Sequence, residues 1–132
     1  MGTQVTGDGS KLLREGLDDL FDAANRAVDA GASTSDFEPA FVRLLAFVRE
    51  NPECQPAAEA RFVGGVRSGA LSWELVAFCM NTLRYRAVED EVRRLLAELP
   101  DPRHTAVLLH MLDAFGDAWE DAEMYAYYRG RA

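Results

Sequence analysis

Apolar residues recur every three or four positions along most of this chain, the spacing that puts them on one face of an α-helix. The pattern is clearest between Ser10 and Gly31, where charged residues fill the opposite face. The apolar half of this stretch carries Leu12, Leu13, Gly16, Leu17, Leu20, Phe21, Ala24, Ala27 and Val28. Because Ser favours helix starts and Gly favours helix ends, the pattern predicts an amphipathic helix over residues 10–31.

A second amphipathic helix is predicted between Ser35 and Pro52. Ser35 and Glu38 have the spacing of a capping box, and Pro39 lies near the first turn, where a missing N–H costs little. Pro52 then stops the helix, because the residue before a proline disfavours helical backbone.

Residues 56–69 combine signals for and against a helix. Pro56 suits a helix start and Gly69 a helix end. Gly64 and Gly65, however, each cost about 1 kcal/mol inside a helix relative to Ala. We expect a short helix with close backbone packing.

Two further helices are predicted over residues 72–85 and 87–100. The first, capped by Ser72, is apolar around most of its circumference and is therefore expected at the centre of the fold. The second is strongly amphipathic, with Val88, Val92, Leu95, Leu96 and Leu99 predicted to point inward. Its charged residues have the spacing of two i,i+4 ion pairs, Glu89 with Arg93 and Asp90 with Arg94.

The last two predicted helices begin at Asp101 and Asp117. Asp101 is followed by Pro102, an arrangement typical of a helix N-terminus. Asp117 has Glu120 three residues further on, a spacing similar to that of a capping box. Both helices carry enough apolar residues to pack against the rest of the fold.

The sequence therefore predicts an all-α protein, with six or seven helices joined by short loops as antiparallel hairpins. Residues 1–9 are expected to be a flexible leader and residues 10–132 a single compact domain. Hairpins over 72–99 and 101–129 would be successive units, and the LPDPR junction between them resembles the joints of HEAT-type repeats. A compact bundle and a short HEAT-like array both fit this pattern.

The charge balance narrows the classes of partner. The chain has 132 residues, with 22 Asp or Glu against 14 Lys or Arg, and a net charge of −8. Because such a field repels phosphate backbones, nucleic acid is not expected as a direct ligand, whereas a basic protein surface is favoured. No stretch approaches the ~20 apolar residues of a membrane span, so no membrane association is expected.

The two cysteines, Cys54 and Cys79, lie on different predicted elements and in no CxxC or Cys/His array. No metal or cofactor site is expected, and scattered cysteines are typical of a reducing cytoplasm. Cys79 falls on the apolar arc of its helix and should be buried. Cys54 lies in a predicted loop and is expected to be exposed, with Glu53 disfavouring its thiolate.

One polar stripe is a candidate ligand pocket. His104 and His110 are six residues apart and point to different sides of one helix, which argues against a shared metal ion. An imidazole oriented by neighbouring charges is one interpretation of the stripe, and a solvated helix face is the other. The ligand-pocket candidates are Arg103, His110 and Asp113, with Tyr125 or Tyr127 from the next helix.

The segment WEDAEMYAYYRG, residues 119–130, concentrates acidic and aromatic residues. On a helix that starts at Asp117, Trp119 and Tyr125 face inward, and the first-turn acids are explained by the helix dipole. The large side chains on the outer face either contact another helix or form a partner surface. The partner-binding candidates are Glu120, Glu123, Met124, Tyr127 and Tyr128.

These patterns favour a cytoplasmic, non-catalytic interaction or regulatory domain that binds a protein partner or a second copy of itself. An acidic inhibitor-like or assembly module fits the charge. No GxSxG turn or P-loop is present in the sequence, and no catalytic residue is assigned. The alternative is an enzyme or small-ligand binder with its pocket near His110 and Asp113.

Overall fold

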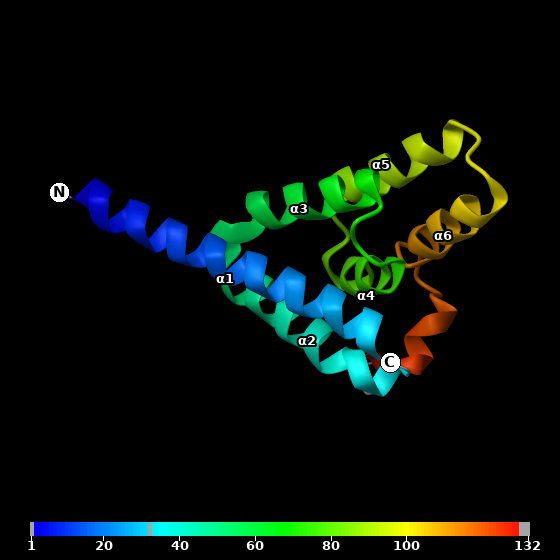
Figure 1. Cartoon of the computed structure of the whole chain (residues 1–132), viewed down its shortest axis with the longest axis horizontal. Coiled ribbons are helices and arrows are strands. Elements are labelled where there is room, and N and C mark those ends of the chain that lie inside the picture. Colours follow the sequence, from blue (N-terminus) through cyan, green and yellow to red (C-terminus); the bar gives the residue numbers. More distant parts are fainter. Residues whose placement is uncertain (1, 32, 130–132) are drawn as a thin grey trace.

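The structure, a computed structural model, describes residues 2–31 and 33–129, with side chains from Lys11 onward. Within these ranges the chain is helical and contains no strand, which confirms the predicted all-α class. The elements are α1 (Gly2–Ala30), α2 (Thr34–Glu50), η1 (Pro52–Cys54), α3 (Gln55–Ser68), α4 (Trp73–Leu83), α5 (Arg86–Ala97), α6 (Pro102–Asp113), η2 (Glu120–Met124) and α7 (Ala126–Arg129), where η marks a 3-10 helix (Figure 1).

The helices surround α4. The broadest helix contacts join α1 with α2, α3 with α5, and α4 with α6, while α4 also contacts α1, α2 and α3 (Figure 1). Six consecutive residues of α4, from Leu75 to Met80, are buried. The predicted central position of this apolar helix is therefore confirmed.

The predicted hairpin over residues 72–99 is not a tight pair of helices, because α5 packs mainly on α3 and α6. The chain changes direction at Arg84, whose backbone is left-handed with a φ of 50°, and at the extended Tyr85. Tyr85 is buried, and its ring lies 6.2 Å from the ring of Phe62 on α3. This contact draws the start of α5 towards α3 and away from α4.

Two predicted helix caps are confirmed, whereas the predicted start of the first helix is wrong. Ser72 and Asp101 accept hydrogen bonds from the N–H groups of Leu75 (3.3 Å) and His104 (2.8 Å), as predicted for N-terminal caps. The first helix does not begin at Ser10 as predicted. Its helical backbone continues back to Gly2 and extends beyond the other helices (Figure 1).

The cap of α2 is Ser33 and not Ser35. The carboxylate of Asp36 accepts the backbone N–H of Ser33 at 3.1 Å, which is the reciprocal bond of a capping box. A cap shifted by two residues uses Asp36 where the sequence predicted Glu38, and the Glu38 side chain is left for a contact elsewhere in the fold.

The short helix expected over residues 56–69 forms as α3, which ends at Ser68 and is followed by Gly69 with a φ of 78°. The close packing predicted for this helix is present at Gly65. A Cβ atom at this position would lie 2.3 Å from the Cγ atom of Leu71, whereas at Gly64 it would meet nothing within 4 Å. The loop after α3 can therefore fold back on the helix only because residue 65 lacks a side chain.

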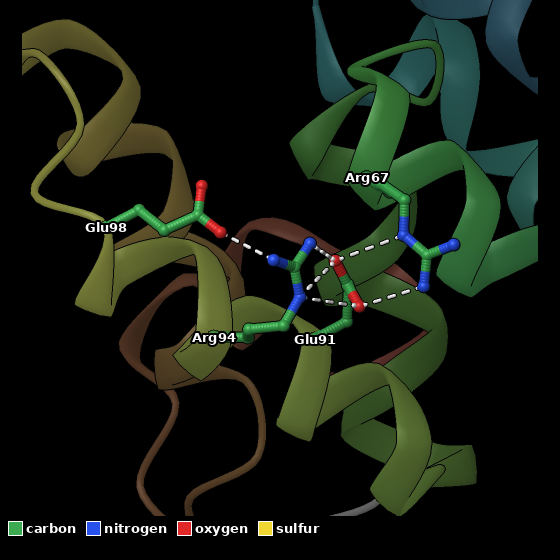
Figure 2. A network of polar contacts seen from close by, with 4 residues as sticks. All are labelled: Arg67, Glu91, Arg94 and Glu98. Atoms are coloured by element: carbon green, nitrogen blue, oxygen red, sulfur yellow. Dashed lines mark hydrogen bonds and ion pairs between the residues drawn. The ribbon is translucent and has the colours of Figure 1, made fainter.

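An ion-pair network at Glu91 joins α3 to α5 (Figure 2). Glu91 is only 6% exposed and accepts hydrogen bonds from Arg94, one turn further along α5, and from Arg67 of α3. The hydrogen bonds from Arg94 and then from Arg67 lower the pKa of Glu91 to about 2. The predicted Asp90–Arg94 pair is wrong, because Arg94 binds Glu91 and Glu98, while the predicted Glu89–Arg93 pair is confirmed at 2.8 Å.

The long last helix predicted from Asp117 does not form. Turns follow α6, and only the 3-10 helix η2 and the single turn of α7 are helical. The Arg84 guanidinium donates to the carbonyls of Phe115 (3.1 Å) and Gly116 (3.4 Å), and these bonds hold the turn in place. Trp119 and Tyr125 are both buried, as predicted, but a bent chain and not a regular helix places them on the core.

The exposure of three side chains can be compared with the sequence prediction. Cys79 is buried as predicted, and burial raises the pKa of its thiol. Cys54, predicted to be exposed, is also buried, because η1 carries it and packs against α1, α2 and α3. Leu99, predicted to point inward, is 88% exposed, since α5 ends before it and its φ is 54°. No helix among the described residues is long and apolar enough to cross a membrane.

Candidate functional site

An open cleft of about 670 Å³ lies between α5, the end of α6 and the segment that follows α6. Its floor includes Leu112, Phe115 and the buried Trp119. Its polar lining consists of the carboxylates Glu89, Asp113, Asp117, Glu120 and Asp121, the guanidinium group of Arg93 and the imidazole of His110. Carboxylates therefore dominate the polar surface of the cleft.

The arginines of this region neutralise two of the five carboxylates. Arg93 binds Glu89 at 2.8 Å, and Arg84 binds Asp117 at 3.3 Å from outside the cleft. Asp113 and Glu120 are exposed and have no ion-pair partner among the described residues. The cleft thus keeps uncompensated negative charge beside an apolar floor.

His110 is positioned by contacts from two other segments. Its imidazole stacks on Trp73 of α4, with the ring centroids 4.5 Å apart and the ring planes 20° apart. Its Nδ1 lies 3.9 Å from Oδ2 of Asp121. Trp73 and Asp121 therefore fix the position of this imidazole at the edge of the cleft.

Trp119 is the buried aromatic residue at the floor of the cleft. Its indole ring stacks on Tyr125 at 5.9 Å and meets Tyr128 edge-on at 5.7 Å. Its Nε1 atom is buried and has no hydrogen-bond partner in the part of the chain that the structure describes. The ring therefore links the cleft to the aromatic cluster of the core.

The structure brings together part of the predicted ligand pocket. His110 and Asp113 both line the cleft, but Arg103 is exposed on an earlier turn of α6 and is absent from its lining. No tyrosine lines the cleft either. Tyr125 is 2% exposed and packs on Phe78 at 4.9 Å, and burial raises the pKa of its hydroxyl.

The predicted partner-binding residues separate into two groups. Tyr127 and Tyr128 are half-buried and contact Phe78 of α4. The Tyr128 hydroxyl donates to the Phe78 carbonyl and is hydrogen-bonded to Thr82 at 2.7 Å, while Arg49 donates to the Tyr127 hydroxyl at 3.2 Å. The exposed candidates are Glu120, Glu123 and Met124, of which Glu120 lines the cleft.

Several cleft residues were not singled out as site residues from the sequence. Glu89 and Arg93 were predicted only as a surface ion pair of a helix, and Asp121 only as a first-turn acid. They reach His110 and Asp113 because α5 lies beside α6 and the chain bends back after Phe115. The i,i+3 spacing of His110 and Asp113 was the one local signal for this site.

The described residues contain no group of three or more His, Cys, Asp or Glu side chains arranged to hold a metal ion. Comparisons of the chain with protein-family models, with curated proteins and with solved structures find no match.

Proposed function

We propose that this protein is a non-catalytic interaction module and that its acidic cleft binds a basic segment of a protein partner. The observation that carries the proposal is the lining of the cleft, in which five carboxylates stand against one arginine and one histidine. Two of these carboxylates, Asp113 and Glu120, have no cation to neutralise them within the described chain.

An arginine or lysine side chain matches this surface chemically. Its aliphatic stem can lie on the apolar floor near Phe115, while its charged end reaches the carboxylates at the rim. The net charge of −8 extends the attraction beyond the cleft and steers a basic partner during encounter. These features favour an acidic, inhibitor-like or assembly role in the cytoplasm, where the unbridged Cys54 and Cys79 would remain reduced.

Affinity capture with matched charge variants tests the proposal. The cleft variant Asp113→Asn/Glu120→Gln and the control Glu15→Gln/Asp19→Asn each remove two exposed negative charges, the latter from α1. A partner bound through the cleft is retained by the wild type and the control from extracts of the native cell, and is lost from the cleft variant. Equal retention by all three proteins would contradict the proposal.

A small-ligand binder remains the second candidate, favoured by the fixed position of His110. Stacking on Trp73 and the nearby Asp121 would orient its imidazole towards a cationic or hydrogen-bonding ligand in the cleft. His110→Asn tests this candidate: loss of a small metabolite that co-purifies with the wild type would support it. An unchanged set of bound metabolites would contradict it.

A further inference from the structure

A second hollow, of about 520 Å³, gathers arginines in this otherwise acidic protein. It lies where the end of α2, the start of α3, the end of α4 and the start of α5 meet. Arg49, Arg84 and Arg86 line it, together with the single carboxylate of Glu59. The lining therefore has an excess of positive charge, opposite to that of the acidic cleft.

Arg49 and Arg86 have donors available for a ligand. Arg86 is exposed and forms no hydrogen bond or ion pair among the described residues. Arg49 is also exposed and donates to the neutral hydroxyl of Tyr127, but it pairs with no carboxylate in the described chain. Both guanidinium groups can therefore turn towards an anion without breaking an ion pair.

Arg84 is already engaged in other contacts. Its Nε and Nη groups already donate to the carbonyls of Asn81, Phe115 and Gly116, and it pairs with Asp117 at 3.3 Å. These bonds hold its cationic group at the edge of the hollow.

The start of α5 adds to the positive field. Tyr85 is the N-cap residue of this 12-residue helix, and its side chain makes no capping hydrogen bond to the first turn. The first backbone N–H groups of α5, beside Arg86, therefore have no acceptor from the N-cap side chain, although Glu89 lies in the first turn. This helix end adds to the positive charge of the arginines, and the arginines are the main reason to expect an anion-binding site here.

We propose that this hollow binds a phosphate group, either as free phosphate or as part of a small phosphate ester. Guanidinium groups bind phosphate oxygens with paired N–H donors, so Arg49 and Arg86 can hold one phosphate from two sides. Glu59, from α3, also lines the hollow, and its carboxylate would repel an anion placed directly beside it. This site is separate from the acidic cleft and does not depend on the function proposed for it.

Chemical-shift titration tests the site, with inorganic phosphate and glycerol phosphate as separate probes and sodium chloride at equal ionic strength as the reference. The amides of residues 84–88 should shift saturably with phosphate and not with chloride. A higher affinity for glycerol phosphate would assign the site to a phosphate ester, and equal affinities would assign it to free phosphate. The absence of a saturable shift with both probes would overturn the proposal.

Arginine variants give the second arm of the test. Arg86→Gln and Arg49→Gln should each weaken binding about tenfold, because each removes a charged, forked donor. Arg43→Gln, which removes an exposed arginine of α2 outside the hollow, should leave the affinity unchanged. An equal loss in all three variants would indicate nonspecific charge attraction and would overturn the proposal.

Discussion

The carboxylate of Glu38 on α2 accepts the backbone N–H of Tyr127 at 2.7 Å, and its other oxygen accepts the N–H of Ala126 at 3.1 Å. A side chain near the start of α2 therefore caps α7, the last helix of the described residues. The two groups are separated by 89 positions in the sequence. This contact holds the C-terminal segment against α2, with Tyr127 and Tyr128 over α4.

Removing this cap should loosen the C-terminal segment. We expect Glu38→Ala to lower the free energy of unfolding by about 1–2 kcal/mol, because two backbone donors lose a charged acceptor. Amide hydrogen exchange should accelerate most at Ala126 and Tyr127. Ser35→Ala is the control, since Ser35 is not the cap, and it should change stability by less than about 0.5 kcal/mol. Equal effects of the two variants would contradict the capping role.

Glu91 should make stability depend on pH at the acidic end. Its pKa is lowered to about 2 by hydrogen bonds from Arg94 and Arg67, so its carboxylate stabilises the fold above its usual pKa of 4.5. This contribution is lost as the pH falls from about 4.5 through about 2. Urea unfolding at stepped pH values should show that the stability difference between wild type and Glu91→Gln shrinks over this range.

At neutral pH, Glu91→Gln should lower the free energy of unfolding by about 1–2 kcal/mol, because the buried acceptor of two arginines loses its charge. Glu89→Gln removes the neighbouring i,i+4 pair with Arg93 and should cost about 0.3–0.5 kcal/mol. A pH-independent difference for Glu91→Gln would contradict the assigned role of its carboxylate.

Two adjacent glycines of α3 should respond in opposite directions to alanine. Gly64→Ala should stabilise the protein by up to about 1 kcal/mol, because the position is open and helical. Gly65→Ala should destabilise it, since its Cβ would lie 2.3 Å from Cγ of Leu71. Thermal unfolding of the two variants measures both effects. A stabilised Gly65→Ala variant would mean that the loop after α3 is not held as described.

Tyr128 should stabilise the core of the fold and not form part of a partner-binding surface. Tyr128→Ala should cost about 2–4 kcal/mol of stability, because the ring contacts Phe78 and Trp119 and its hydroxyl is bonded within the fold. Met124→Ala, at a side chain that is 53% exposed, should cost less than about 0.5 kcal/mol. Chemical denaturation distinguishes these values. A stable Tyr128→Ala variant with altered self-association would instead support the partner surface predicted from the sequence.

The helices that were predicted correctly are those whose start residues and apolar faces can be recognised within the helix itself. Ser72, Asp101 and Pro102 mark helix starts through contacts within one turn, and the apolar circumference of α4 required burial on several sides. The C-terminal segment was predicted wrongly. Its acidic and aromatic residues fit a helix, but contacts with residues far away in the sequence bend the chain. Arg84 binds the turn after α6 from another helix, and Glu38 caps α7 from α2.

The acidic cleft was predictable only in part, because contacts between distant segments assemble most of it. His110 and Asp113 share a helix face, and their spacing indicated a common position. The remaining cleft residues come from α5 and from the bent segment, so their proximity depends on the packing of the whole fold. Arg49 and Arg86 are likewise brought together by the meeting of four helix ends, which no local pattern encodes.

The most direct test of the acidic cleft is a chemical-shift titration with a hexa-arginine peptide. The chain contains its own control, because Glu15 and Asp19 form an exposed acidic face on α1. We predict saturable shifts centred on Asp113, Trp119 and Glu120, which disappear in the Asp113→Asn/Glu120→Gln variant. Shifts of equal size along α1, or shifts that persist in that variant, would contradict the claim that the cleft is the binding site for basic segments.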